Sequence, residues 1–166
     1  MGIIVAVANQ KGGVGKTTTC VNLGACLAEK GKKVLLVDID PQGNATSGLG
    51  IDRQQLKQCV YDLLINGEKA RGLMLETGIS RLWLLPATIR LAGAEIELVP
   101  LMGRESRLKE GLREVVSDFD FIFIDCPPSL GLLTVNALTS AHRVIVPIQC
   151  EYYALEGLGQ LMNTFH

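Results

Sequence analysis

The amino-acid sequence predicts an α/β fold: an open, mostly parallel, doubly wound sheet with helices on both faces. Short apolar runs alternate with helix-like segments along all 166 residues, as expected of strands joined by right-handed crossovers. The first apolar run leads through a glycine-rich segment directly into a helix-like run. Acidic residues follow the second and fourth strands, at the edge where open parallel sheets bind ligands. We expect a single domain over residues 1–166.

Five strands are expected from the apolar runs. Residues 3–8 are continuously apolar and rich in β-branched side chains, which suits a central strand covered on both faces. The other strands are expected over residues 34–37, 82–85, 119–124 and 144–148. Trp83, within the third strand, is expected to pack in the core or to be partly covered.

Helices are expected between these strands. The helix over residues 17–30 carries apolar or small residues nearly all round, so it should be largely buried, and Gly31 is a natural stop. Further helices are expected over residues 54–65, 92–100, 104–117 and 132–141, and another begins at residue 153. Two stretches lack a clear helical or strand pattern: residues 43–50 should form a loop, and residues 68–80 a short helix or irregular structure.

Composition excludes several classes of protein. The net charge of −1 and the pI of about 6.1 do not suit a strongly basic nucleic-acid binder. Five cysteines without a C-x-x-C spacing indicate buried free thiols in a reduced, cytosolic compartment. No apolar run approaches the ~18 residues of a membrane span, and the N-terminus lacks the features of a signal peptide or a myristoylation site. We therefore expect a cytoplasmic protein with no membrane attachment.

The glycine-rich segment that follows the first strand has the features of a phosphate-binding loop. Its backbone N–H groups and the following helix N-terminus would face an anion, Lys16 would reach the β/γ-phosphates, and the Thr17 hydroxyl would ligate Mg²⁺. The strict pattern G-x-x-x-x-G-K-[ST] requires glycine at position 10, where this chain has Gln10, so the loop is a deviant P-loop. The residues expected to bind the nucleotide are Gly12, Gly13, Val14, Gly15, Lys16, Thr17 and Thr18.

Three aspartates follow two other strands. Asp125 ends the fourth strand and resembles a Walker B aspartate, which would hold Mg²⁺ through water near Thr17. Asp40 follows the second strand and could orient a water that attacks the γ-phosphate. The structural alternatives are an Asx turn before Pro41 for Asp38 and Asp40, and a turn cap for Asp125.

Lys11 adds a second positive charge to the loop. Its side chain could point at the nucleotide of its own chain, or across an interface at that of a partner. In the second arrangement it would act as an arginine finger does when supplied in trans, a device worth about 10³–10⁵ in rate. The structural alternative is a solvated lysine that only raises the local potential.

These motifs resemble those of known ATPases. Lys11–Thr18 looks like the deviant Walker A sequence of the ParA/MinD family. Asp38–Thr46 is similar to the corresponding segment of the ParA/Soj branch, the chromosome and plasmid partition ATPases. Other segments similar to that branch are residues 86–88, 91–95, 125–131 and 151–157.

The resemblance implies a P-loop NTPase fold and a weakly active ATPase. ATP with Mg²⁺ would drive a face-to-face homodimer in which Lys11 reaches the partner's phosphates. Thr18 would join Lys16 and Thr17 in holding phosphates and metal, Asp40 would position water, and Asp125 would support Mg²⁺. A ParB-like centromere-binding protein would stimulate hydrolysis, and the ATP-bound dimer would bind DNA without sequence preference.

An apolar stripe at helical spacing continues to the end of the sequence without a stop signal. It consists of Leu155, Leu158, Leu161, Met162 and Phe165. Members of the family that it resembles extend well past this helix, so we expect a chain that lacks its C-terminal portion. That portion usually carries adenine contacts and basic residues that bind DNA, which makes DNA binding an expectation for the full-length protein only.

Three alternatives remain open at this stage. One is a nucleotide-binding fragment that does not hydrolyse ATP. Another is a MinD-like membrane-cycling ATPase, whose membrane helix would lie in the absent C-terminal portion. The third is an iron–sulfur ATPase of the nitrogenase iron-protein type, for which Cys126 has no evident second cysteine.

Overall fold

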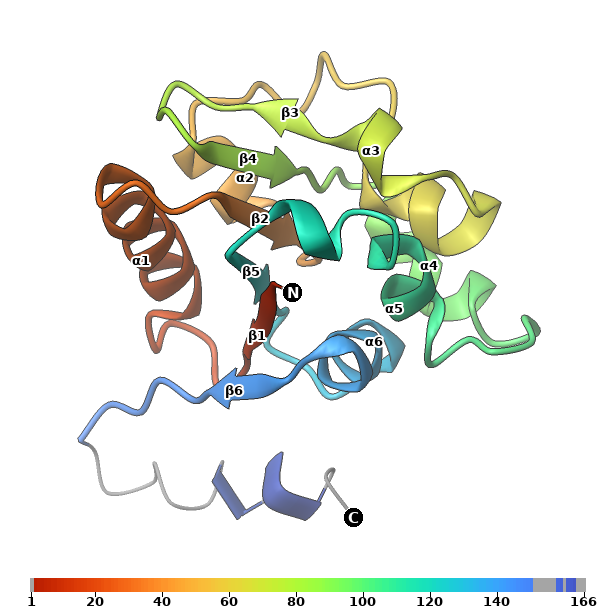
Figure 1. The fold of residues 1–166 in the computed structure, drawn as a ribbon. Helices are drawn as coiled ribbons and strands as arrows, with labels where there is room; N and C mark the ends of the chain where they lie inside the picture. The colour runs from red at the N-terminus through yellow and green to blue at the C-terminus, as the bar shows by residue number, and fades with distance from the viewer. Residues whose placement is uncertain (1, 151–157, 160, 164–166) are drawn as a thin grey trace.

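The computed structural model describes residues 2–150, 158–159 and 161–163. Figure 1 shows a central six-stranded sheet in the order β3-β4-β2-β5-β1-β6. Every neighbouring pair is parallel except β3 and β4, which pair antiparallel at one edge. Helix α1 lies on one side of the sheet and helices α4, α5 and α6 on the other. The expected fold class is therefore confirmed.

The secondary-structure elements have the following bounds. The strands are β1 Ile3–Val7, β2 Val34–Asp38, β3 Leu75–Glu76, β4 Leu82–Leu85, β5 Phe121–Asp125 and β6 Arg143–Ile145. The α-helices are α1 Lys16–Glu29, α2 Asn44–Gly48, α3 Ala70–Leu73, α4 Leu91–Glu97, α5 Arg107–Leu112 and α6 Leu132–Ser140. A π-helical turn, η1, spans Asp62–Asn66, and a 3₁₀ turn, η2, spans Val116–Asp118.

The core has two layers because successive side chains of a strand point to opposite faces of the sheet. In β2, Leu35 and Val37 belong to the layer covered by α4, α5 and α6. Val34 and Leu36 belong to the layer beneath α1, together with Cys20 of that helix. Both faces of the central strands are thus buried, which explains why their sequences are continuously apolar.

Two expectations for the segment after β2 are wrong. Residues 44–48, expected in a loop, form the short helix α2. Gly43 precedes this helix and lies in the left-handed region with φ of 60°. The helix has a polar sequence and is stabilised by the buried carboxylate of Asp38, which binds Thr46. The helix expected over residues 54–65 begins only at residue 60, after turns and irregular structure. The Asp52 carboxylate accepts the N–H of Gln54 and competes with helical hydrogen bonding in the earlier part.

Other elements are shorter than expected or were missed. Strand β6 ends at Ile145 and not at residue 148, before Pro147, which has no N–H to contribute to a ladder. The helix expected over 104–117 covers only residues 107–112 before a turn and η2. Strand β3, two residues long, was missed within residues 68–80. The half-buried Trp83 packs edge-to-face on Phe119, with 5.5 Å between ring centroids.

The cysteine and membrane expectations have mixed outcomes. Cys20, Cys59 and Cys126 are buried free thiols as expected, whereas Cys26 and Cys150 are exposed. Within the described part of the chain, no helix is both long and apolar enough to cross a membrane. The helix expected from residue 153 and its apolar stripe lie largely outside the described residues, although Leu161 is buried and Met162 is half exposed.

Candidate functional site

The glycine-rich loop connects the end of β1 to the start of α1 at the carboxyl edge of the sheet. Gly13 and Gly15 adopt φ of 70° and 91°, a left-handed conformation that side chains with a Cβ rarely adopt. The loop forms one wall of a cleft of about 370 Å³. The cleft is lined by Gly12, Gly13, Gly15, Lys16, Thr17, Thr18, Asp40, Gln42, Asn44 and Pro128. Val14 is buried and does not line the cleft.

Lys16 folds back onto its own loop. Its Nζ donates a hydrogen bond to the carbonyl oxygen of Lys11 at 2.8 Å, and its side chain is largely buried. Burial lowers the pKa of Lys16, while the nearby carboxylates of Asp125 and Asp40 act in the opposite direction. The ammonium therefore lies inside the loop, close to two acids, where it can exchange a carbonyl for a stronger acceptor.

Asp125 and Thr17 are paired at the base of the cleft. The Thr17 hydroxyl donates to Oδ2 of Asp125 at 2.7 Å. The other carboxylate oxygen, Oδ1, is buried and has no hydrogen-bond partner among the described residues. Burial raises the pKa of Asp125 to about 7, against the Thr17 hydrogen bond, which lowers it. An unsatisfied buried acceptor is costly, and a metal-bound water is a donor that would satisfy it, so the pair fits a hydrated Mg²⁺.

Asp40 lies on the opposite wall of the cleft. Its Oδ1 accepts the backbone N–H of Gln42 at 2.9 Å, and the residue is mostly buried. The Asx-turn geometry that was the structural alternative is thus present, and it holds a carboxylate that lines the cleft. The two interpretations coexist, and the role of Asp40 with water stays a prediction.

Asp38 does not line the cleft, although it lies beside Asp125 in the β2–β5 ladder. It is fully buried and accepts hydrogen bonds from the N–H of Thr46 at 2.9 Å, the Thr46 hydroxyl at 2.7 Å and the N–H of Asp40 at 3.1 Å. Burial raises the pKa of Asp38 to about 6 despite these donors. This carboxylate is a structural anchor behind the site.

Two polar side chains hold the P-loop from the β6 side. Asn9 Oδ1 accepts the N–H of Lys11 at 3.0 Å, and its Nδ2 donates to the carbonyl of Pro147 at 2.9 Å. Gln149 Nε2 donates to the carbonyl of Gly13 at 3.0 Å. Sequence reasoning missed both residues. The signal for Asn9 was a buried amide at the end of an apolar strand, but its partner lies 138 residues away.

Another missed residue supports the loop that follows Asp125. Glu95 of α4 accepts the backbone N–H groups of Leu132 and Leu133, at 2.7 and 3.2 Å, and so caps the N-terminus of α6. A Cβ at Gly131 would lie 2.5 Å from the Glu95 carboxylate, so a larger residue at this position would displace the carboxylate from its present place. The cap fixes the start of α6 and with it the end of the segment that leads from Asp125.

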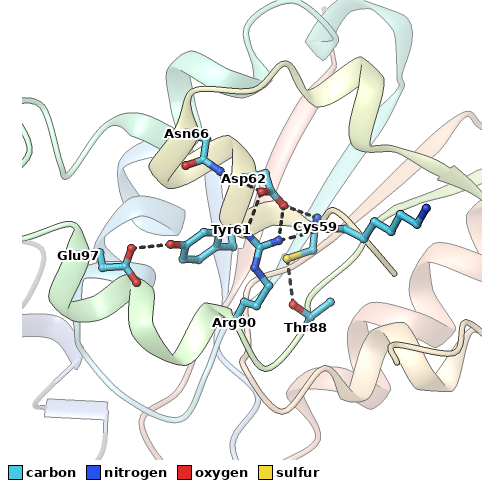
Figure 2. A network of polar contacts seen from close by, with 8 residues as sticks. Cys59, Tyr61, Asp62, Asn66, Thr88, Arg90 and Glu97 are labelled. Atoms are coloured by element: carbon cyan, nitrogen blue, oxygen red, sulfur yellow. Dashed lines mark hydrogen bonds and ion pairs between the residues drawn. The ribbon is translucent and has the colours of Figure 1, made fainter. Parts of the chain in front are cut away.

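A separate polar network ties η1 to the segment after β4 (Figure 2). Arg90 forms a two-pronged ion pair with Asp62, at 3.0 and 3.1 Å, and lies 4.5 Å from the centre of the Tyr61 ring. Tyr61 donates to Glu97 of α4, and Cys59 contacts the Thr88 hydroxyl. None of these residues lines the cleft beside the P-loop. The network therefore stabilises the packing of η1 against the segment after β4. A separate cavity of about 510 Å³ lies beside α5, and none of the P-loop residues lines it.

The raised pKa values make stability depend on pH. The folded state holds the protons of Asp38 and Asp125 more tightly than the unfolded state, in which the pKa of an aspartate is near 3.9. The free energy of unfolding should therefore fall as pH rises. The fall extends from about pH 4 to about pH 6 for Asp38 and to about pH 7 for Asp125. For Asp38 the loss is about 3 kcal/mol, since one pKa unit is worth about 1.4 kcal/mol. Chemical denaturation from about pH 4 to about pH 8 would measure the combined loss from Asp38 and Asp125.

A matched pair of variants assigns the effect. Asp38→Asn should remove the part of the pH dependence that lies between about pH 4 and about pH 6 and keep the part that Asp125 carries, whereas Glu29→Gln, at an exposed site at the end of α1, should leave the whole dependence unchanged. Equal slopes for the parent and Asp38→Asn would show that this carboxyl does not carry the linkage.

Comparison with known proteins places the chain in a family. A family model described as an AAA domain matches residues 2–166. This chain belongs to the AAA domain family. The chain is 64% identical over 164 residues to the sporulation initiation inhibitor protein Soj of Bacillus subtilis, and the match covers 99% of the chain and 65% of Soj. It is 53% identical to the chromosome partitioning protein ParA of Myxococcus xanthus, covering 99% of the chain and 58% of ParA.

Solved structures agree with this placement. A plasmid partition protein from Borrelia burgdorferi superposes on this chain with a TM-score of 0.86 and 30% identity, over 99% of this chain and 73% of that protein. A Mycobacterium smegmatis protein described as a cobyrinic acid a,c-diamide synthase, with a bound ATP analogue and magnesium, gives a TM-score of 0.94 and 50% identity, over 99% and 65%. The resemblance to ParA/Soj partition ATPases is confirmed, and the chain spans about two thirds or less of the length of the curated relatives Soj and ParA.

Proposed function

We propose that this chain binds Mg-ATP in the cleft between the P-loop and the Asp40 segment and acts as a weakly hydrolysing, ATP-dependent dimerisation switch in chromosome or plasmid partition. The observation that carries the proposal is the Thr17–Asp125 pair beside Lys16. The P-loop end of α1 supplies a hydroxyl ligand and an ammonium, and the end of β5 supplies a buried carboxylate oxygen without a partner in the described chain. These are the groups that a magnesium-bound triphosphate requires.

Relatives support the choice of nucleotide. The Mycobacterium smegmatis structure holds an ATP analogue and magnesium, and a putative plasmid partition protein from Borrelia burgdorferi, 30% identical, holds AMPPNP. The partition role rests on identities of 64% to Soj and 53% to ParA. The amide-synthase name of the Mycobacterium smegmatis protein belongs to that protein, whose identity to this chain is 50–51%.

Each residue of the cleft has a proposed task. Thr17 would ligate Mg²⁺ directly and Asp125 through water, and the metal, when bound, neutralises charge on the phosphate oxygens. Lys16 would release the Lys11 carbonyl and donate to the phosphates, with Thr18 and the loop N–H groups as further donors. Asp40 would orient the attacking water with a carboxylate whose direction the Gln42 N–H fixes.

The dimer is proposed from Lys11. Its backbone is held at both ends, because its N–H donates to Asn9 and its carbonyl accepts from Lys16. The side chain is half-buried on the same loop that binds the phosphates, a suitable position for reaching the nucleotide of a second copy. For the whole protein we propose stimulation by a ParB-like partner and binding of the dimer to DNA without sequence preference, in the cytoplasm at the nucleoid.

Asp40 provides the test that separates a hydrolase from a binding module that does not hydrolyse. Asp40→Ala should lower phosphate release by about 10²-fold, the low end for a positioned acid–base group, while Mg-ATP affinity stays near that of the parent. Asp52→Ala, at an exposed aspartate nearby, is the control. If the parent and Asp40→Ala release phosphate at the same background rate, hydrolysis by this chain is refuted and the non-hydrolysing module is favoured.

The iron–sulfur alternative meets a physical obstacle. Cys126 is buried, and burial raises its pKa well above the usual range for a thiol, whereas a cluster shared between subunits needs exposed thiolates. The membrane-cycling alternative would depend on segments outside the described residues.

A further inference from the structure

Thr46 has an unusual position for a hydroxyl residue. It lies in α2, is fully buried, and does not line the nucleotide cleft. Its hydroxyl accepts the backbone N–H of Ala87 at 3.0 Å and donates to Asp38 at 2.7 Å. The hydroxyl thereby joins the segment after β4 to the end of β2, two elements that are neighbours in the sheet.

From Asp38 the hydrogen bonds continue to the cleft. One carboxylate oxygen of Asp38 binds the N–H and hydroxyl of Thr46, and the other binds the N–H of Asp40. Asp40 in turn accepts the N–H of Gln42. A continuous series of hydrogen bonds therefore leads from Ala87, through Thr46 and Asp38, to the backbone N–H of Asp40, the residue whose carboxylate lines the cleft.

The series closes the segment that carries Asp40. The Asp38 carboxylate binds the chain at Asp40, just after β2, and again at Thr46, within α2, so it holds the connection between β2 and α2 from both sides. Within the segment, the Gly43 N–H donates to the Asp40 carbonyl at 2.8 Å. Such a loop has few remaining degrees of freedom, and a carboxylate on it is held in one direction before any ligand binds.

We propose that Thr46 and Asp38 are a positioning pair for Asp40: they set the direction of its carboxylate and thereby the rate of hydrolysis, without touching the nucleotide. The inference rests on the proposed role of Asp40 in hydrolysis. Only a hydroxyl can both accept from Ala87 and donate to Asp38 at this place. Its removal leaves the Ala87 N–H without its acceptor and takes one of three donors from a buried carboxylate.

The pair is tested by exchanging the hydroxyl for a methyl group of similar size. Thr46→Val should lower kcat by roughly 10- to 100-fold, the range of a misplaced catalytic group, and change KM and the affinity for an ATP analogue little. Amide hydrogen exchange of residues 42–46 should accelerate in the absence of nucleotide, while that of β1 and β5 stays slow. Thr46→Ser keeps the hydroxyl and should restore both readouts.

Ser140→Ala is the matched control for stability, because Ser140 is a buried hydroxyl on α6 with a single carbonyl partner, Asn136. If Thr46→Val loses no more kcat than Ser140→Ala, or if residues 42–46 exchange as in the parent, the positioning role is overturned. Should Thr46→Val fail to fold, Asp38→Asn carries the same comparison, since it keeps one acceptor oxygen.

The two readouts keep the inference separate from the proposed function. If the parent releases no phosphate, the hydrolase proposal fails, and exchange of residues 42–46 still decides whether Thr46 holds the segment. Accelerated exchange in Thr46→Val, restored in Thr46→Ser, would then support the positioning pair alone. Unchanged exchange would overturn it.

Discussion

Lys16→Ala is expected to weaken binding of Mg-ATP by roughly 10- to 150-fold, the effect of losing about 1.5–3 kcal/mol of hydrogen bonding to a charged group. The ammonium is the charged donor that the loop holds ready, and without it the Lys11 carbonyl also loses its 2.8 Å partner. Binding is measured most directly as stabilisation. The parent should gain about 2.7 kcal/mol at a ligand concentration one hundred times its dissociation constant, and the variant should gain much less at that concentration.

Lys32→Ala is the control for the loss of a lysine charge, because Lys32 is exposed and precedes β2 at the opposite edge of the sheet. The Lys32→Ala variant should be stabilised by Mg-ATP as much as the parent. If Mg-ATP stabilised Lys16→Ala as much as the parent, the nucleotide would bind elsewhere and the assignment of the cleft would be wrong. The assignment would also be wrong if Mg-ATP did not stabilise the parent.

Lys11→Ala should separate nucleotide binding from dimerisation. The variant retains both backbone hydrogen bonds of residue 11, to Asn9 and from Lys16, so the loop should keep its shape and most of its affinity for ATP. Dimerisation with Mg-ATP should disappear if the side chain reaches the partner's phosphates. Sedimentation velocity with and without Mg-ATP measures the change directly.

Lys57→Ala, at an exposed lysine outside the loop, should dimerise as the parent does. A Lys11→Ala protein that still dimerises with Mg-ATP would refute the role in trans and leave the alternatives in which Lys11 serves its own nucleotide or only raises the local potential. A variant that loses both binding and dimerisation would assign Lys11 to its own site.

The sheet and the P-loop were predictable because their signals are local. A strand buried on both faces is mostly apolar, and β1, β2 and β5 are apolar apart from the aspartates that end β2 and β5. Gly13 and Gly15 mark the turn because their backbone conformation excludes most other residues. The helices that were placed well, α1 and α6, follow directly from long runs of suitable residues.

The missed features depend on side-chain hydrogen bonds that the apolar pattern of the sequence does not show. Helix α2 contains polar residues and glycine, and the Asp38 carboxylate holds it through Thr46, eight residues on. Asn9 and Glu95 bind segments 138 and 37 residues away. A single sequence marks such residues only as polar groups near apolar ones, so their roles emerge only when the fold supplies the partner.

The strand order has a consequence for the biogenesis of the chain. β1 and β2 carry the P-loop and the Asp40 segment, yet they are not neighbours, because β5 lies between them. During synthesis the first 120 residues can therefore present both halves of the cleft but cannot join them. Insertion of β5 joins the two halves of the sheet and brings Asp125 to Thr17, and β6 then adds at the edge beside β1. The Thr17–Asp125 pair of a nascent chain therefore forms only once β5 has docked between β1 and β2.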